Sequence, residues 1–526
     1  MDLEAGTRPV GPRRAELLAA LSMAIDLGLG QPMEHMLRAA LISTRLADRL
    51  DLGPDQRATV YYVSLVSWIG CHADSHEYAR YFGDDIDTRA ASYQVEWAGL
   101  PFLQLLVHRV GRGRPAPQRA WLVGDVLTRG RGDFVAMIRS HCTSAGLLAT
   151  EVGLPADVTR ALSNTFERWD GKGMPDGLRG ADIAIEMRVA QLADVAEVWL
   201  RTHGVDACLD MVRSRRGRQF DPEVADAFLA ERATWMELLA LDDVWRATLE
   251  QDPDGDRVLA GDDLERIVTA VGDFADLKCP FTLGHSRGVA ALAGQAAYQS
   301  GLGEDAAAQV RRAGHLHDLG RLGVSNAVWE KPGPLSSAEW ERVRLHPYFT
   351  ERILRRVRGL EPEAAIAAAH HERQDRSGYP QGLSGSALGP AQRLLAAADS
   401  FHTWLEPRPH RPPHTEAEAV QRLQDEARSG RLDPEAVEAV LAVTGRRARR
   451  RDLWPDGLTT REVEVLRLLA LARSNRQIAE ELVVSEKTVR NHVEHIYAKI
   501  GVTNRVGAGL YAVHAGLTRE FPHPTG

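Results

Sequence analysis

The 526-residue chain contains few cysteines and no long hydrophobic run, and both absences narrow its class. Its four cysteines, Cys71, Cys142, Cys208 and Cys279, are isolated and form no Cys-x-x-Cys pair. The sequence therefore predicts neither a disulfide framework nor a cysteine zinc site. No stretch of about 18 apolar residues is present, and residues 1–14 lack the apolar core of a secretory signal. We therefore expect a cytoplasmic protein with no membrane partner.

The chain also lacks an overall positive charge, because its formal net charge is -8. This balance argues against a protein that coats nucleic acid over its whole surface, so any contact with DNA must come from a local basic patch. The run Arg446-Arg-Ala-Arg-Arg-Arg451 and the segment that follows it supply such a patch. We interpret the run itself as a solvated linker and not as a specific reader of DNA.

Strand-like alternation is scarce, whereas apolar residues recur at helical spacing in most long segments, such as 16–24 and 364–369. The sequence therefore predicts an all-α protein. Its length exceeds what one core can hold and suggests about three domains of ~100 to 200 residues. Breaks that contain proline and glycine fall at 251–261, 406–413 and 445–457.

An internal repeat relates the first half of the chain to the second. The segment Glu167-Arg-Trp-Asp-Gly-Lys-Gly-Met-Pro-Asp-Gly-Leu-Arg-Gly180 parallels Glu372-Arg-Gln-Asp-Arg-Ser-Gly-Tyr-Pro-Gln-Gly-Leu-Ser-Gly385. Residues 188–194 likewise parallel residues 393–399. The repeat predicts two copies of one helical unit.

The second copy gathers imidazole and carboxylate side chains on helices that are otherwise rich in alanine and leucine. These side chains lie in His315-Leu-His317-Asp318, in His370-His371, and at the separate positions His285, His346 and Asp399. Nitrogen and oxygen ligands of this kind suit two first-row transition ions. A pair of ions can stabilise the attacking and leaving oxygens of a phosphodiester displacement.

The first copy has lost most of these side chains. Ser67-Trp68 occupies the position of His317-Asp318, and Thr165-Phe166 occupies that of His370-His371. Of the candidate ligand set, the first copy keeps His35, His141 and Asp194. We expect it to bind no metal and to serve a structural or regulatory role.

Over about residues 270 to 442, the second copy resembles the HD-GYP family of HD-domain metal-dependent phosphohydrolases, whose known members hydrolyse cyclic di-GMP. The resemblance implies a centre of two divalent ions, drawn from Fe, Mn, Co, Ni or Zn, with catalytic roles for His317, Asp318 and Arg321. It implies that Asp318 bridges the two ions. The implied ligands of the first ion are His285, His317, Asp318 and Asp399, and those of the second are Asp318, His346, His370 and His371.

The resemblance also implies how the substrate is held and cut. Phe281 stands where a trinuclear subclass has glutamate, which favours two ions and cleavage that ends at the linear dinucleotide. The implied substrate-binding residues are Arg321, Tyr379, Arg408 and Arg411. The chain departs from the family pattern at Arg321, where lysine is usual, and at Arg376, where the signature loop has glycine. Arginine places bulk where a left-handed turn or a close approach would require glycine.

Near the C-terminus, the segments 474–479 and 485–492 have the pattern of a helix-turn-helix, and residues 458 to 517 resemble the LuxR type. Thr459 and Glu462 have capping-box spacing that predicts a helix start near residue 460. Ser474 and Ser485 are expected to begin the next two helices, with a turn at 483–484. Val489, Val493 and Ile496 recur at helical spacing and should face inward.

The opposite face of the third of these helices would meet DNA. Its predicted contacts are Lys487, Thr488, Arg490, Asn491 and Glu494. Lysine and arginine neutralise phosphates, whereas Arg490 and Asn491 also carry the donors and acceptors that read guanine or adenine. The resemblance implies a homodimer formed through the final helix, at about residues 503–516.

Together these observations predict four segments. They are a degenerate HD-like regulatory domain at 1–240, an HD-GYP-type domain at 241–445, a basic linker at 446–456 and a LuxR-type DNA-binding domain at 457–526. The expected function is cyclic di-GMP hydrolysis coupled to control of transcription, with DNA and a cyclic dinucleotide as partners. Two alternatives stay open: a ligand-sensing transcription factor with little turnover, and a phosphohydrolase of another nucleotide.

Overall fold

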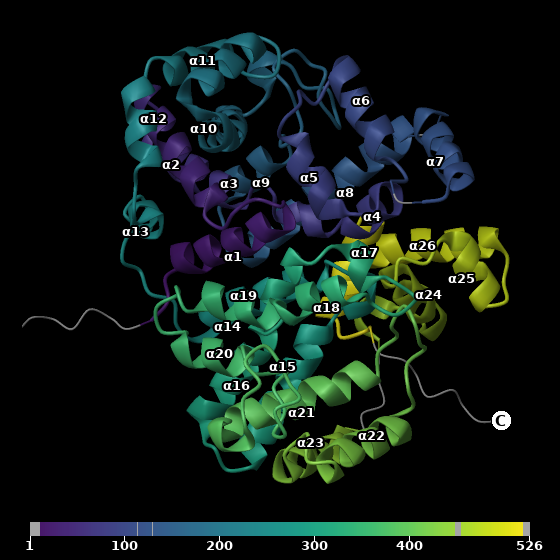
Figure 1. The fold of residues 1–526 in the computed structure, drawn as a ribbon. Coiled ribbons are helices and arrows are strands. Elements are labelled where there is room, and N and C mark those ends of the chain that lie inside the picture. The colour runs from purple at the N-terminus through teal and green to yellow at the C-terminus, as the bar shows by residue number, and fades with distance from the viewer. Residues whose placement is uncertain (1–10, 113, 129, 448–453, 519–526) are drawn as a thin grey trace, which may run out of the picture. The chain divides into compact units, whose positions relative to one another are not determined.

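The computed structural model describes residues 11–112, 114–128, 130–447 and 454–518. Within these ranges every regular element is a helix, and extended backbone pairs only at four isolated bridges, which confirms the all-α prediction (Figure 1). None of the described helices is long and apolar enough to cross a membrane.

Among the described residues, thirteen α-helices precede the second repeat. They are α1 (Arg14–Gly28), α2 (His35–Arg49), α3 (Pro54–Val66), α4 (Ser75–Phe82), α5 (Asp85–Ser92), α6 (Gly99–Arg109), α7 (Ala116–Thr128), α8 (Gly130–Glu151), α9 (Ala156–Leu162), α10 (Ile185–Arg215), α11 (Pro222–Leu229), α12 (Arg232–Leu239) and α13 (Val244–Leu249). The helix α10 is interrupted at Gly204, where φ is 81°. Two short 3-10 helices lie among them, η1 (Ile69–His72) and η2 (Gly180–Asp182).

The remaining α-helices form the second repeat and the C-terminal bundle. They are α14 (Gly261–Asp276), α15 (His285–Gln299), α16 (Glu304–Leu316), α17 (Asn326–Trp329), α18 (Ser337–Arg344), α19 (His346–Leu354), α20 (Glu361–Ala367), α21 (Pro390–Trp404), α22 (Glu416–Arg428), α23 (Pro434–Arg447), α24 (Thr460–Ala470), α25 (Asn475–Glu481), α26 (Glu486–Ile500) and α27 (Arg505–His514). Short 3-10 helices occur at η3 (Pro280–Thr282), η4 (Leu319–Gly323), η5 (Gly385–Ala387) and η6 (Pro455–Gly457).

The chain divides into two compact units. The first contains the residues up to Ala270 together with Leu322–Val328 and Glu351–Glu361, and the second contains Val271–Arg321, Trp329–Thr350 and the residues from Pro362 on. The division into four segments stays a prediction from the sequence. The two compact units do not separate the C-terminal bundle from the second repeat. Six residues of the predicted linker, 448–453, lie outside the described part of the chain.

The core of the first unit forms where α2, α3 and α10 pack together. Ile42 and Leu46 lie one turn apart on α2 and are fully buried, as are Val189 and Leu192 on α10. Helical spacing places these apolar side chains on one face of each helix, so their burial holds the helices against each other.

The two repeats share the same loop after their matching glutamates. Glu167 Oε1 accepts a hydrogen bond from the backbone N–H of Asp176 at 2.8 Å. Nine residues after Glu372, the N–H of Gln381 donates to Glu372 Oε1 at 2.7 Å in the same way. A buried carboxylate therefore anchors the loop in both copies, which supports the repeat found in the sequence.

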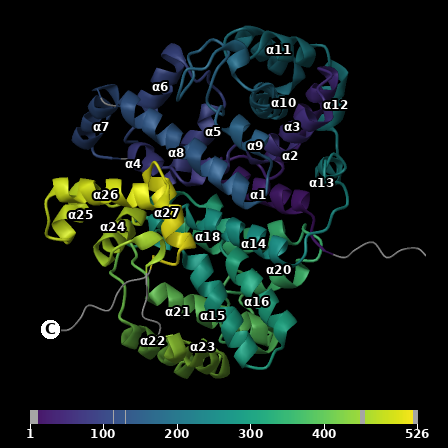
Figure 2. The same ribbon diagram turned by 180° about the vertical axis from the view of Figure 1, so that it is seen from behind.

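The predicted caps of the C-terminal bundle are present. Thr459 and Glu462 form the capping box at the start of α24, and Ser474 and Ser485 cap α25 and α26. The turn between α25 and α26 passes through Val483, whose φ is 54°. Figures 1 and 2 show α24 to α27 gathered in yellow as one small bundle, with α24 packed on α27 and α26.

The inward face of α26 also agrees with the sequence analysis. Val489 and Ile496 are fully buried, and Val493 packs against the same core. The four helices therefore have the arrangement expected of a helix-turn-helix domain.

Candidate metal centre

Asp318 lies between two sets of histidines because its two carboxylate oxygens face in different directions. Its Oδ2 lies 3.6 Å from His285 Nε2 and 3.5 Å from His317 Nε2. Its Oδ1 lies 3.4 Å from His346 Nε2 and 3.6 Å from His370 Nε2. A carboxylate in this position can bind one ion through each oxygen.

Backbone carbonyls orient three of these rings. The Nδ1–H groups of His317, His346 and His370 donate to the carbonyl three residues earlier, at 2.8, 2.6 and 2.6 Å respectively. Each of the three histidines lies at or just beyond a helix end, where such carbonyls lack an intrahelical partner. The bonds fix the tautomer, so each ring presents the lone pair of Nε2 toward Asp318.

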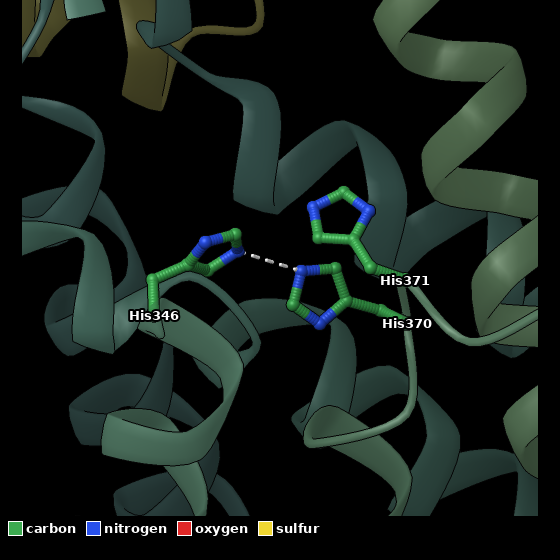
Figure 3. A group of neighbouring side chains, drawn as sticks. All are labelled: His346, His370 and His371. Carbon is green, nitrogen blue, oxygen red and sulfur yellow. Dashed lines mark hydrogen bonds between the residues drawn. The ribbon is translucent and has the colours of Figure 1, made fainter. Parts of the chain in front are cut away.

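Two pairs of these nitrogens lie unusually close for groups that both act as acceptors. His346 Nε2 lies 3.1 Å from His370 Nε2, with His371 beside them (Figure 3). His285 Nε2 lies 3.2 Å from His317 Nε2. Two lone pairs at this distance repel each other unless a proton or a metal ion lies between them.

Asp399, on α21, completes the cluster. Its Oδ1 lies 3.3 Å from His285 Nε2, and its Oδ2 lies 3.7 Å from His371 Nδ1. All seven side chains predicted as metal ligands therefore meet at one place in the second unit. The structure thus brings together the side chains that the sequence analysis expected to lie together. Their roles as metal ligands remain a prediction.

The residues present fit a metal centre. Three groups of potential ligand atoms lie close enough together to share an ion: His346 with His370 and His371, His285 with His317 and Asp399, and His317 with Asp318 and His370. Asp318 Oδ1 is buried and makes no hydrogen bond in the protein. An uncompensated buried carboxylate oxygen is costly, and a cation would satisfy it. Mixed imidazole and carboxylate ligands suit Fe, Mn, Co, Ni or Zn.

The electrostatics of the cluster favour neutral rings at His317, His370 and His371, whose pKa values are lowered, beside the ionised carboxylates of Asp318 and Asp399. Burial, together with the charges of His317 and His346, lowers the pKa of His370 to about 3. Burial would raise the pKa of Asp318, but the charges of Arg321 and His317 hold it well below its usual range. These are the protonation states that a bound metal requires.

His285 differs from the other histidines of the cluster. Burial lowers the pKa of His285, but the charge of Glu406 and a hydrogen bond with Asp399 raise it well above its usual range. The same carboxylates that favour a protonated His285 would favour a metal cation at Nε2, since both carry positive charge.

A close backbone contact brings His346 to Asp318. The N–H of Gly320 donates to Thr350 Oγ1 at 2.9 Å, and that hydroxyl donates to the carbonyl of His317 at 2.9 Å. A Cβ at Gly320 would lie 2.0 Å from the carbonyl oxygen of His346. Only glycine therefore allows α19 to lie against the segment that carries His317 and Asp318.

Arg321 lies directly behind Asp318. Its Nη1 donates to Asp318 Oδ2 at 2.8 Å, and its guanidinium stacks on the ring of Trp329 at 4.0 Å. This arrangement fixes both the charge and the plane of the guanidinium. A catalytic or substrate-binding role for Arg321 remains a prediction, and the structure shows that it orients Asp318.

The other predicted substrate residues are distributed around the cluster. The Tyr379 ring lies 4.7 Å from the His371 ring. Arg408 donates to the carbonyl of Phe281 at 2.6 Å and to Glu406 at 2.8 Å, and Arg411 donates to the carbonyl of Thr403 at 2.7 Å. Both arginines therefore donate hydrogen bonds within the protein, and their contacts with substrate remain a prediction.

Arg376 adopts the left-handed conformation that its position in the signature loop suggested. Its φ is 68°, and the matching Gly171 of the first repeat has φ 74°. Gly378, two residues later, is required by close approach, because a Cβ there would lie 2.3 Å from the backbone nitrogen of Arg373. The loop thus keeps its shape although arginine replaces the usual glycine.

The first repeat fills the place of the metal centre with hydrogen bonds. Asp194 Oδ1 accepts from Trp68 Nε1 at 2.9 Å and from the Tyr93 hydroxyl at 3.2 Å, and it lies 3.1 Å from His35 Nε2. The His141 ring packs against the Phe166 ring at 4.8 Å. Among the described residues, none of the groups with metal-ligand geometry lies in this repeat.

Sequence reasoning missed a carboxylate behind His285. Glu406 lies 3.1 Å from His285 Nδ1 and 2.9 Å from His402 Nδ1. These three side chains form a further group with metal-ligand geometry. Glu406 lies four residues after His402, just beyond the end of α21, and this helical spacing is the signal that could have identified it.

The predicted DNA contacts lie on one face of α26. Lys487, Arg490, Asn491 and Glu494 are exposed. Thr488 is partly buried, and its hydroxyl lies 2.8 Å from that of Ser485 at the helix cap. The exposed face is available to DNA, and base recognition remains a prediction.

Two protein families match this chain. The HD domain family matches residues 132–224 and 269–436, and the luxR family of bacterial regulatory proteins matches residues 456–512. The first HD segment falls in the first repeat, and the second contains all seven cluster residues, from His285 to Asp399. The luxR segment contains α24 to α26 and most of α27.

Cyclic dinucleotide phosphodiesterases match between a third and most of the chain. The 3'3'-cGAMP-specific phosphodiesterase 3 of Vibrio cholerae is 30% identical over 431 residues, which are 81% of this chain and 93% of that protein. A cyclic di-GMP phosphodiesterase of Thermotoga maritima is 35% identical over 178 residues, 33% of this chain and 47% of that protein. The chain also matches the crystal structure of a cyclic GMP-AMP phosphodiesterase of V. cholerae (V-cGAP3), with 27% sequence identity and a TM-score of 0.58. The match covers 85% of this chain and 100% of that chain.

Proposed function

The chain belongs to the HD-GYP family of HD-domain phosphodiesterases and carries a luxR-type domain, and from this premise we propose that it hydrolyses a cyclic dinucleotide and couples this reaction to DNA binding. The reaction is assigned to the cluster that contains His285, Asp318 and Asp399. The DNA contacts are assigned to the exposed face of α26.

The position of Asp318 carries the catalytic assignment. Its two oxygens face separate histidine sets within 3.4 to 3.6 Å, as a bridging ligand of two ions would. Two divalent ions held by these residues would supply positive charge to the attacking and leaving oxygens of a phosphodiester. Around them, His317, His346 and His370 hold their lone pairs in place through their backbone hydrogen bonds, and Arg321 fixes the plane of Asp318.

Cyclic di-GMP is the proposed substrate, and 3'3'-cGAMP is the second candidate. The family resemblance favours the first, whereas the relative that matches 81% of this chain is specific for the second. The proposed product is the linear dinucleotide, because Phe281 replaces the glutamate of the trinuclear subclass. Arg321, Tyr379, Arg408 and Arg411 are the proposed substrate-binding side chains. Release of Arg408 and Arg411 from their carbonyl partners would free donors for phosphate or guanine.

A second function is favoured by one observation at the centre. Arg321 donates to Asp318 Oδ2, an oxygen that one ion would use, and it replaces the lysine of the family pattern. A chain that binds the nucleotide with little turnover would act as a ligand-sensing transcription factor. The two functions share the metal and the ligand and differ in the rate of hydrolysis.

Turnover by the full chain separates these functions. The experiment supplies Mn²⁺ or Fe²⁺ under reducing conditions, offers cyclic di-GMP and 3'3'-cGAMP in parallel, and follows the linear product. Hydrolysis of either nucleotide that is lost in Asp318→Asn supports the enzyme. Tight binding of the nucleotide without product supports the sensor, and an absence of both binding and hydrolysis contradicts both proposals.

The C-terminal bundle is proposed to bind DNA as a homodimer. Lys487, Arg490 and Asn491 are exposed on α26, which corresponds to the recognition helix of this motif. The dimer itself rests on the family resemblance. Sedimentation of the full chain with and without an operator selected from random DNA tests it, and a monomer in both conditions would contradict the two-fold assembly.

A further inference from the structure

A half-exposed arginine lies beside the candidate metal centre. Arg344 is the last residue of α18 and stands two positions before His346, one of the candidate ligands. The His346 Nδ1–H donates to the carbonyl of Val343 at 2.6 Å, so the last turn of α18 is fixed to the centre. The side chain of Arg344 is 47% exposed. The cluster therefore sets the position of Arg344, while much of its side chain stays open to solvent.

The Arg344 side chain extends toward the signature loop. Its guanidinium carbon lies 5.7 Å from the centre of the Tyr379 ring, and that ring lies 4.7 Å from the His371 ring. A guanidinium within about 6 Å of an aromatic ring is attracted to the face of that ring. The N–H groups of a guanidinium lie in its plane and form a rigid fork, so contact with a ring leaves them available to a ligand.

Other arginines around the centre already use their donors. Four of them donate to protein oxygens at 2.6 to 2.9 Å: Arg321, Arg373, Arg408 and Arg411. Within the part of the chain that the structure describes, Arg344 makes no hydrogen bond, and Glu341 Oε1 lies 3.6 Å from its Nη1. The fork of Arg344 is therefore the one of these five that a ligand can engage without displacing a protein acceptor.

An exposed indole lies one helical turn before Arg344. Trp340 is four residues earlier on α18, so the two side chains share one face of the helix, with Cβ atoms about 5 to 6 Å apart. Tryptophan is highly buried on average in folded proteins, yet Trp340 is 48% exposed. This face of α18 thus combines a stacking surface with a hydrogen-bonding fork. Proteins hold an unpaired nucleobase by these two means.

We propose that Trp340 and Arg344 recognise a guanine of the cyclic dinucleotide, with the base stacked on Trp340 and the Arg344 fork donating to its O6 and N7. This inference rests on the proposed function and extends it from the phosphates to the base. An arginine fork matches the O6 and N7 acceptors of guanine, whereas adenine carries an amino donor beside its N7. Cyclic di-GMP and 3'3'-cGAMP both contain guanine, so the assignment holds for either candidate substrate.

A base suits this position better than a phosphate does. Arg344 contacts Tyr379, which in turn contacts His371, so the guanidinium is one side chain removed from the candidate metal ligands. It would meet a part of the substrate that is remote from the phosphate at the ions. A phosphate would interact with the charge of Arg344, but it would make no use of the exposed Trp340 ring. A purine uses both side chains.

A nucleotide that lacks one acceptor tests the contact in the metal-loaded full chain. The probes are cyclic di-GMP or 3'3'-cGAMP, whichever the wild type binds more tightly, and the same nucleotide with 7-deazaguanine, which has no N7 acceptor. The wild type should prefer the natural form at least tenfold, because a hydrogen bond from a charged donor is lost. Arg344→Met should weaken binding of the natural form at least tenfold and bind both forms equally. The loss should appear in KM more than in kcat where the nucleotide is hydrolysed, and in Kd where it is only bound.

Three further variants separate the charge, the stacking and the surface position. Arg344→Lys keeps the charge without the fork, so it should also fail to distinguish the two forms. Trp340→Ala should weaken binding of both forms at least tenfold. Arg355→Met is the matched control, because Arg355 is also exposed and its glutamate, Glu351, also lies 3.6 Å away. This control should keep the wild-type affinity and the wild-type preference. Elemental analysis should find the same metal content in every variant.

The outcomes decide the proposal in either direction. A preference for the natural form that is lost in Arg344→Met and kept in Arg355→Met supports it. An equal preference in wild type and Arg344→Met would overturn the guanine contact, as would a wild type that does not distinguish the two forms. A loss of affinity in Arg344→Met that is the same for both forms would assign a phosphate contact in its place. A wild type that binds neither cyclic dinucleotide would contradict the proposed function itself, so the two failures are distinguishable.

Discussion

The indole Nε1 of Trp68 donates a hydrogen bond to Asp194 Oδ1 at 2.9 Å. Trp68 occupies the position that Asp318 holds in the second repeat. Neutral donors from Trp68 and Tyr93 thus accompany His35 at the carboxylate of the first repeat, whereas its counterpart Asp399 faces the ring nitrogens of His285 and His371. The two repeats solve the same electrostatic problem in different ways. One pairs its buried carboxylate with N–H and O–H donors, and the other presents lone pairs that require a cation.

A matched pair of substitutions tests this contrast. We expect the full chain to hold about two transition ions and Asp318→Ala to lose them. The rate of hydrolysis should fall at least a hundredfold in that variant, which corresponds to an increase of ~3 kcal/mol in the activation free energy. Asp194→Ala should keep both ions. It should instead destabilise the first unit by about 3 kcal/mol, because Trp68 and His35 lose a buried partner. Elemental analysis and calorimetry of both variants provide the measurements. Ions lost from Asp194→Ala, or retained turnover in Asp318→Ala, would contradict the assignment.

The buried His35 predicts how stability depends on pH. Burial would lower the pKa of His35, but the charge of Glu197 and a hydrogen bond with Asp194 raise it to about 10. A histidine with a raised folded pKa stabilises fully below its unfolded pKa of about 6.5, and this stabilisation is lost as pH rises toward 10. The free energy of unfolding of the first unit should therefore fall between pH 7 and 10, and His35→Gln should flatten that fall.

A neighbouring carboxyl must be controlled for in this measurement. Burial raises the pKa of Asp26 to about 8, so its ionisation also lowers stability as pH rises. Calorimetry of Asp26→Asn isolates the contribution of His35. A decline in stability of equal size in Asp26→Asn and in the double variant with His35→Gln would show that His35 does not contribute.

Some features of the centre could be predicted because they are local in the chain. His317 and Asp318 are adjacent, and the helix caps at Thr459, Ser474 and Ser485 rest on residues three positions apart. The separated candidate ligands His285, His346 and Asp399 were expected from the family resemblance, whereas the adjacent pair and the helix caps are local patterns. Patterns of this kind survive in a single sequence because a few neighbouring residues determine them.

Other features depend on contacts between distant segments. Trp68 reaches Asp194 across 126 positions, and nothing beside either residue signals the hydrogen bond. Arg408 and Phe281 are separated by 127 positions, so the capture of this arginine by a carbonyl could not be foreseen. Such partners are fixed only when the helices pack, so the hydrogen-bonded surroundings of the candidate ligands could not be read from the sequence.

The signature loop should become more stable when Arg376 is replaced by glycine. Its φ of 68° lies in the left-handed region, where a side chain costs about 1 kcal/mol, and its side chain is exposed. Arg376→Gly should therefore raise the free energy of unfolding by about 1 kcal/mol. The reverse change in the first repeat, Gly171→Arg at φ 74°, should lower it by a similar amount. Denaturant titration measures both, and shifts of the same sign would contradict the explanation.

Glu406 should hold His285 in the orientation that binds metal. Its carboxylate lies 3.1 Å from His285 Nδ1. Loss of such an outer partner typically weakens metal affinity by about 10- to 100-fold. Glu406→Gln should therefore lower the affinity of one ion while the other stays bound, as followed by competition with a metal-binding dye. Equal loss of both ions would indicate a general collapse of the site, and no change would show that Glu406 serves only to hold Arg408 and His402.

DNA binding by residues 455–526 should be steeply dependent on salt, and two kinds of substitution on α26 should differ. Arg490→Ala or Asn491→Ala should reduce the preference for the selected operator by about 1 to 3 kcal/mol, because each loses a base contact. Lys487→Ala should weaken binding to all sequences more evenly and reduce the slope of log K against log salt by about one, since one phosphate contact is lost. Titrations of operator and random DNA over a salt series measure both quantities. All three side chains are exposed on the same helix, so none of the substitutions should disturb folding, and each variant is a folding control for the others. If Arg490→Ala and Asn491→Ala leave both operator preference and affinity unchanged, another face of the bundle must meet the DNA.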